Sequence, residues 1–150
     1  MGARRIPRPQ TGIPASPDDV LKWLEFLTLS SDSRGLAGYE LAECTELLAM
    51  NFLGRFSGEV SCEGRARTLR SVLVVILNDE SAASGPDKAT LMLLGLTPST
   101  TKQPRSVRRQ RAANTLELVL DTFQKTYERK LLRDVAHEIW RLEIEVSRTA

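Results

Sequence analysis

The fold is decided by residues 106–142, which read SVRRQRAANTLELVLDTFQKTYERKLLRDVAHEIWRL. A short basic segment comes first, an apolar connection follows at residues 117–120, and an amphipathic stretch completes it. Phe123, Tyr127 and Leu131 recur every four residues, which is the spacing of one helical face. The same face continues with apolar residues at helical spacing: Leu132, Val135, Ile139, Leu142 and Val146. These residues predict a short basic helix, a turn and one long amphipathic helix.

Both predicted helices begin at residues that commonly cap helices. Ser106 precedes the arginine-rich segment, and Asp121 with Thr122 precedes the long apolar face. Residues 102–111 carry five positive charges and no acidic residue. If Ser106 caps a helix, its arginines are spread around the helix, so some of them must face solvent.

Four further helices are expected upstream. The first begins at Ser16 and Pro17, because serine caps helices and proline is tolerated at their first position. The second is expected from about residue 37 to residue 52. The third covers residues 59–80, although residues 72–77 also fit a buried strand. Helix is favoured there because no second β-rich segment is available for pairing. Residues 88–96 form the fourth.

Together these elements predict an all-α protein, a compact bundle of about five to six helices with a helix-turn-helix-like C-terminal part and a long terminal helix. Residues 1–15 contain three of the seven prolines and several arginines, so we expect a disordered basic tail. Residues 16–150 then form a single helical domain. Within it, residues 16–96 supply the N-terminal helices and residues 105–147 the helix-turn-helix-like part.

The composition narrows the class of protein. The net charge of +2 is close to neutral, so any nucleic-acid binding must depend on clustered charges. Cys44 and Cys62 lack zinc-ligand spacing, and we expect both thiols to be reduced and buried, as in a cytoplasmic protein.

No apolar segment is long enough for a membrane span. No metal or cofactor motif is present, and the lone His137 has no nucleophile beside it, so a non-enzymatic protein is expected.

Residues 91–143 resemble a helix-turn-helix-like tail found in uncharacterised bacterial regulatory and signalling proteins. The shared pattern has an arginine-rich helix with two alanines, a short turn, Asp-Thr-Phe and a leucine-rich helix. The matching residues are Arg108, Arg109, Arg111, Ala112, Ala113, Leu116, Asp121, Thr122, Phe123, Lys125, Glu128, Leu131 and Leu132. Where such motifs usually have glycine in the turn, this chain has Glu117, which predicts an altered turn.

Two functions fit these observations. The first is a regulatory or adaptor module that binds a protein partner, or a second copy, through the C-terminal helices. The alternative is a DNA-binding regulator in which arginines contact phosphates and the second helix reads bases. The exposed positions of Asp121 and Glu128 would oppose phosphate binding. The candidate interaction residues are Arg105, Arg108, Arg109, Arg111, Thr122, Gln124, Lys125 and Arg129. Neither a membrane nor a small-molecule substrate is expected as a partner.

Overall fold

A computed structural model describes residues 16–29, 34–36, 45–48, 50, 52–53, 61–77 and 85–149. Regular structure in these segments is helical, apart from a single bridge between Arg34 and Leu36. The all-α prediction is therefore confirmed for the described part of the chain. The predicted tail at residues 1–15, Cys44 and most of the helix predicted at residues 37–52 lie outside the described residues.

The helices follow the order α1 (Pro17–Leu29), α3 (Thr45–Leu48), α5 (Cys62–Leu77), α6 (Gly85–Leu93) and α7 (Arg105–Thr115). A nearly continuous helical segment then comprises α8 (Leu120–Thr122), the π-helix η1 (Phe123–Tyr127) and α9 (Glu128–Thr149). Residues 72–77 belong to α5, so the helical alternative is correct there. In the second predicted helix, Met50 is not helical, so the helix does not extend unbroken to residue 52. Cys62 is exposed, which corrects the expectation of a buried thiol.

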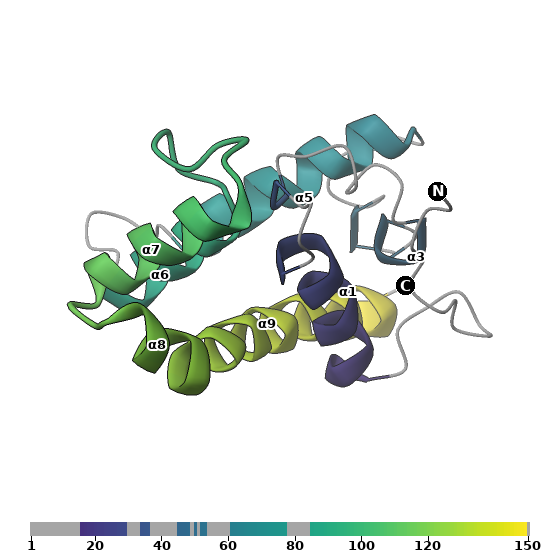
Figure 1. The fold of residues 1–150 in the computed structure, drawn as a ribbon. Coiled ribbons are helices and arrows are strands. Elements are labelled where there is room, and N and C mark those ends of the chain that lie inside the picture. Colours follow the sequence, from purple (N-terminus) through teal and green to yellow (C-terminus); the bar gives the residue numbers. More distant parts are fainter. Residues whose placement is uncertain are drawn as a thin grey trace, which may run out of the picture.

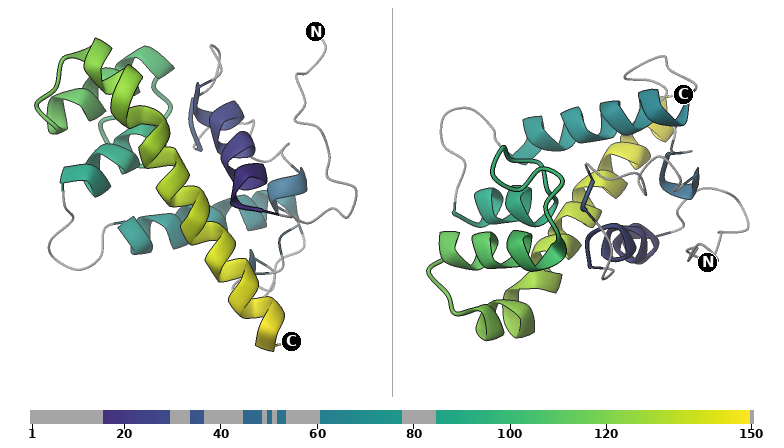
Figure 2. Two further views of the ribbon diagram at one scale, coloured as in Figure 1. Left: turned by 90° about the horizontal axis from the view of Figure 1, so that it is seen from below. Right: turned by 45° about the horizontal axis from the view of Figure 1, so that its top comes forward.

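The long helical segment from α8 to α9 is the central element of the fold. Figure 2 shows α1 on one side of α9 and α6 with α7 on the other, and α1 and α6 both contact α9. Phe123, Leu132 and Ile139 on this segment are fully buried. On α1, Val20, Trp23, Leu24 and Leu27 are buried, as their spacing of three and four residues requires. Burying these two stripes together forms the core between α1 and α9.

Helices α6 and α7 lie side by side and end in the same way (Figure 1). After α6, the Leu96 N–H donates to the Leu91 carbonyl, and the Gly95 N–H donates to the Met92 carbonyl. This pair of bonds is the Schellman motif, which requires a left-handed residue after the helix. Gly95 supplies that residue with φ 76°.

Glu117 takes the equivalent left-handed position after α7, with φ 57°. The Leu118 N–H donates to the Ala113 carbonyl at 2.9 Å, and the Glu117 N–H donates to the Asn114 carbonyl at 3.0 Å. The expectation that glutamate would alter this turn is therefore wrong. The chain forms the usual turn with a residue that pays a steric penalty of about 1 kcal/mol there.

The predicted caps differ from the observed helix starts. Pro104 is the N-cap of α7 and Val119 is the N-cap of α8, and neither provides a side-chain cap. Ser106, Asp121 and Thr122 therefore lie inside the first turn of their helices. Helix α6 similarly begins at Gly85, earlier than the turn predicted through Asp87.

Replacing Glu117 with glycine should stabilise the protein by about 1 kcal/mol, because glycine adopts the left-handed conformation without a Cβ clash. Urea unfolding of the wild type and of Glu117→Gly measures this difference. The matched control is Gln110→Gly, an exposed position within α7, which should destabilise by about 1 kcal/mol. A Glu117→Gly variant that is as unstable as this control would contradict the assigned turn.

Candidate interaction site at the C-terminal helix pair

Arg108 lies at the centre of the arginine-rich helix α7, and its side chain is fully buried. Its guanidinium donates to the carbonyl oxygens of Leu93 at 2.6 Å, Thr28 at 3.0 Å and Gln103 at 3.0 Å. Leu93 is the last residue of α6, and Thr28 lies in the last turn of α1. Carbonyls at helix C-termini lack partners within their helix and carry partial negative charge. The buried Arg108 guanidinium therefore donates hydrogen bonds to carbonyl groups at the ends of α1 and α6 and in the loop that precedes α7.

Two glycines make room for the Arg108 side chain. A Cβ on Gly95 would lie 3.3 Å from Arg108 Cδ and 3.1 Å from the Arg34 carbonyl oxygen. A Cβ on Gly35 would overlap the Leu94 carbonyl oxygen and lie 3.3 Å from Arg108 Nη1. Gly35 also has a positive φ of 73°. Both positions therefore require glycine for backbone conformation and for close packing around the guanidinium.

The electrostatic setting of Arg108 is unfavourable for its charge. Burial lowers the pKa of Arg108 to about 10, the nearby charges of Arg109, Arg105 and Arg34 act in the same direction, and Glu128 opposes them. The guanidinium still carries its proton at neutral pH. Its hydrogen bonds to helix-terminal carbonyls and the charge of Glu128 offset the desolvation of the cation.

Arg105 supports the same contact between α7 and α1. Its Nη1 donates to the carbonyl oxygen of Leu29, the last residue of α1, at 2.6 Å. Arg105 and Arg108 occupy successive turns of α7 and bind successive carbonyls of α1. Helix α1 has no basic residue of its own in its last turn, so these two arginines provide its favourable C-terminal charge.

Arg109 forms a bidentate ion pair with Glu128 that joins α7 to the start of α9. Its Nε and Nη2 donate to the two carboxylate oxygens at 2.6 and 3.0 Å. The two side chains are 17% and 6% exposed. Glu128 is therefore buried and neutralised, which corrects the expectation that it lies on the surface and repels phosphate. A bidentate, largely buried pair also fixes the angle between the two helices.

The π-helix η1 explains why Glu128 reaches Arg109. The Glu128 N–H donates to the Phe123 carbonyl, five residues earlier, so Phe123 and Glu128 lie on the same side of the helix. In a regular α-helix Tyr127, four residues after Phe123, would take that side instead. Phe123 and Glu128 are both buried. The extra residue in this turn thus directs a carboxylate toward α7.

The remaining candidate residues lie on the surface. Arg111, Thr122 and Gln124 are exposed. Lys125 pairs with Asp121 at 3.2 Å in an exposed pair, and Arg129 pairs with Glu25 of α1 at 2.7 Å. The structure therefore divides the eight candidates into two groups: Arg105, Arg108 and Arg109 make contacts within the fold, whereas Arg111, Thr122, Gln124, Lys125 and Arg129 are exposed. Among the exposed group, Arg129 also pairs with Glu25 of α1.

Two further exposed cations of α9 were not among the candidate residues. Lys130 and Arg133 are exposed on the same helix as Lys125 and Arg129. Lys125, Arg129 and Arg133 follow one another at intervals of four, a spacing that could have revealed a basic stripe on one face. We call Lys125, Arg129, Lys130 and Arg133 the basic stripe. It runs along the exposed side of η1 and the first turns of α9.

The described residues contain no group of three or more His, Cys, Asp or Glu side chains that could hold a metal ion. His137 is exposed on α9. None of their helices combines the length and the apolar character that crossing a membrane requires.

Comparisons with family models, curated proteins and solved structures found no match to this chain. The geometry and charges described above are therefore the basis for a functional assignment.

Arg108→Ala should destabilise the protein by about 3–5 kcal/mol, because it leaves buried carbonyls without donors and opens a cavity. Arg108→Lys should also destabilise, because one ammonium cannot replace the branched contacts of a guanidinium. Arg111→Ala, on the exposed side of the same helix, is the matched control and should change stability by less than about 0.5 kcal/mol. Equal urea midpoints for Arg108→Ala and Arg111→Ala would refute the internal role of Arg108.

Proposed function

We propose that this chain is a non-enzymatic regulatory or adaptor module that acts by protein–protein interaction through its C-terminal helices. The observation that carries the proposal is the internal use of Arg105, Arg108 and Arg109. A helix-turn-helix protein that binds DNA needs such cations on its surface, where they face phosphates. Here they bind helix-terminal carbonyls and Glu128, so the helix pair serves as a rigid support for the surface of α9.

The exposed side of α9 suits a protein partner because it carries charges of both signs along its length. The basic stripe occupies its first turns, whereas Asp134, Glu138 and Glu145 follow further along. Arg141 pairs with Glu138 at 2.7 Å and with Glu145 at 3.7 Å. A surface with charges of both signs gives orientation and selectivity to a protein interface and is poorly matched to a uniformly anionic duplex. The same proposal makes the protein a bacterial cytoplasmic regulator, as the resemblance of residues 91–143 implies.

DNA binding is a second candidate, favoured by the geometry of the turn. Glu117 adopts the left-handed conformation that such turns need, and Glu128 is buried against Arg109. Two of the features expected to oppose groove docking are thereby removed. Thr122, Gln124 and Lys125 remain exposed at the start of the second helix, where a recognition helix would contact bases. Asp121, 72% exposed beside Lys125, still opposes the approach of phosphate.

Affinity capture with the full chain separates the two candidates. We expect at least one protein to be retained from the lysate of the producing cells after nuclease treatment. It should be lost when Lys130→Glu and Arg133→Glu are combined, because these charges lie on the proposed surface of α9. The matched control reverses two exposed charges elsewhere, Lys22→Glu on α1 with Arg67→Glu on α5, and should keep the partner.

Three results would contradict the protein-binding proposal. One is a captured protein set that is identical for the wild type and the α9 variant. Another is loss of every captured protein on nuclease treatment, together with direct retention of duplex DNA that weakens with salt. That second result would establish the DNA candidate, provided that Lys125→Ala with Arg129→Ala reduces the retention. The third is loss of the partner from the Lys22→Glu, Arg67→Glu control as well.

A further inference from the structure

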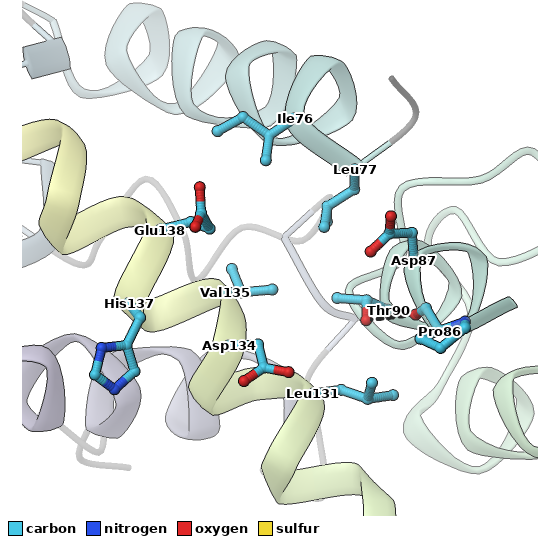
Figure 3. Close-up of a pocket in the computed structure, with 10 residues that line it drawn as sticks. All are labelled: Ile76, Leu77, Pro86, Asp87, Thr90, Leu131, Asp134, Val135, His137 and Glu138. Carbon is cyan, nitrogen blue, oxygen red and sulfur yellow. Dashed lines mark hydrogen bonds between the residues drawn. The ribbon is translucent and has the colours of Figure 1, made fainter. Parts of the chain in front are cut away.

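A cleft of about 430 Å³ lies where the end of α5, the start of α6 and the middle of α9 meet. Figure 3 shows Leu77 of α5 facing Leu131 and Val135 of α9 across it. These three side chains are 7%, 5% and 2% exposed, so they form an apolar floor that solvent barely reaches. The volume is at the lower end of the range for ligand sites, and it is sufficient for anchoring side chains of a larger partner.

The apolar surface continues from the cleft onto α5. Ile76 lines the cleft, and Val75 beside it is 70% exposed, one of the two most exposed large hydrophobic side chains among the described residues. Val72 lies one turn earlier on the same face and is partly exposed. A single exposed valine is ordinary, but an exposed apolar strip that leads into an apolar cleft is typical of a protein-binding surface.

Carboxylates surround this apolar surface. Asp87 of α6 and Asp134 with Glu138 of α9 line the cleft, and Figure 3 shows their carboxylates arranged around Leu77 and Val135. Among the described residues that line the cleft, the only basic-type side chain is His137, whose ring points away from Leu77 and Asp87 in the same view. Arg141 pairs with Glu138 at 2.7 Å and offsets one of these charges, so the rim keeps an excess of carboxylates in a chain whose net charge is positive.

The apolar floor and the carboxylate rim together determine the chemistry of a molecule that fits the cleft. A nucleic acid or an anionic lipid surface would be repelled by this excess of carboxylates. A segment with lysine or arginine beside apolar side chains would meet both the rim and the floor. Apolar residues at helical spacing can also cover the cleft and the Val72–Ile76 strip together, as in helix-in-groove recognition.

We propose that the cleft between α5, α6 and α9 docks a cationic amphipathic helix of a partner protein. Its apolar side chains lie on Leu77, Leu131 and Val135, and its cations lie beside Asp87, Asp134 and Glu138. This inference rests on the proposed protein-binding function and names the chemistry of the partner segment. It assigns the interface to the acidic part of α9, next to the basic stripe.

A synthetic probe tests this assignment without a cellular partner. The probe is a fluorescein-labelled peptide of about 14 residues with leucine at helical spacing and lysine or alanine elsewhere. Binding to the full chain is measured by fluorescence anisotropy. Replacing every lysine of the peptide with glutamate should abolish binding, and replacing every leucine with serine should abolish it as well.

Variants of the chain locate the bound peptide. Asp134→Asn with Glu138→Gln removes two rim charges at constant size and should weaken binding about tenfold. Val75→Ser, at an exposed position that leaves the core intact, should weaken it severalfold. The matched control, Asp121→Asn with Glu145→Gln, removes two exposed charges from the same helical segment outside the cleft and should change affinity less than about twofold.

Equal weakening by the rim and control variants would overturn the assignment, because binding would then reflect total charge. Equal binding of the lysine and glutamate peptides, or no binding of the lysine peptide, would also overturn it. These results are independent of the capture experiment. If the chain retains a partner that depends on α9 and yet fails to bind the lysine peptide, the proposed protein-binding function stands, and only the assignment of a cationic helix is wrong.

Discussion

The hydrogen bonds of Arg108 to three carbonyl oxygens connect segments that are far apart in sequence. Thr28 lies 80 residues before Arg108, and Leu93 lies 15 residues before it. The Thr28 and Leu93 carbonyls lie at or near helix C-termini, where a partner is missing within the helix. Helix α1 packs on α9, and α6 packs on α7, so the guanidinium joins the two halves of the bundle. Gly35 and Gly95 have the conformation and size that this arrangement demands.

The same constraint determines what remains available for function. Once Arg105, Arg108 and Arg109 bind within the fold, Arg111 is the remaining exposed arginine of the arginine-rich helix. The basic surface instead lies on the next helix, where η1 and α9 carry the basic stripe. The acidic, partly apolar cleft lies further along α9. One long helical segment therefore carries two surfaces of opposite character, and the Arg109–Glu128 pair joins this segment to α7.

The helices themselves were largely predictable from the sequence. The apolar spacing of α1, α5 and α9 specified their buried faces, and Gly95 marked the end of α6. The sequence indicated the positive charges of α7 but not the groups that they bind. A carbonyl oxygen is present in every residue, so no sequence pattern indicates that Arg108 binds Thr28 and Leu93.

Two local features were similarly hidden. The left-handed conformation of Glu117 is disfavoured by its side chain and is imposed by the packing of α7 and the following turn. The π-helix η1 shifts the buried face by one residue, so periodicity alone placed Glu128 on the surface. Both features depend on tertiary contacts, and both changed the interpretation of the candidate site.

Arginine-specific labelling of the native chain tests most directly whether these arginines are internal. Phenylglyoxal modification, quantified by peptide mass spectrometry, compares each arginine in the folded chain with the same arginine in urea. The structure predicts that Arg111 reacts at nearly the same rate in both states, whereas Arg108 is strongly protected when folded and Arg109 is protected to a lesser degree. If Arg108 reacted as rapidly as Arg111 in the folded protein, the arginine-rich helix would present its charges to solvent and this account of the fold would be wrong.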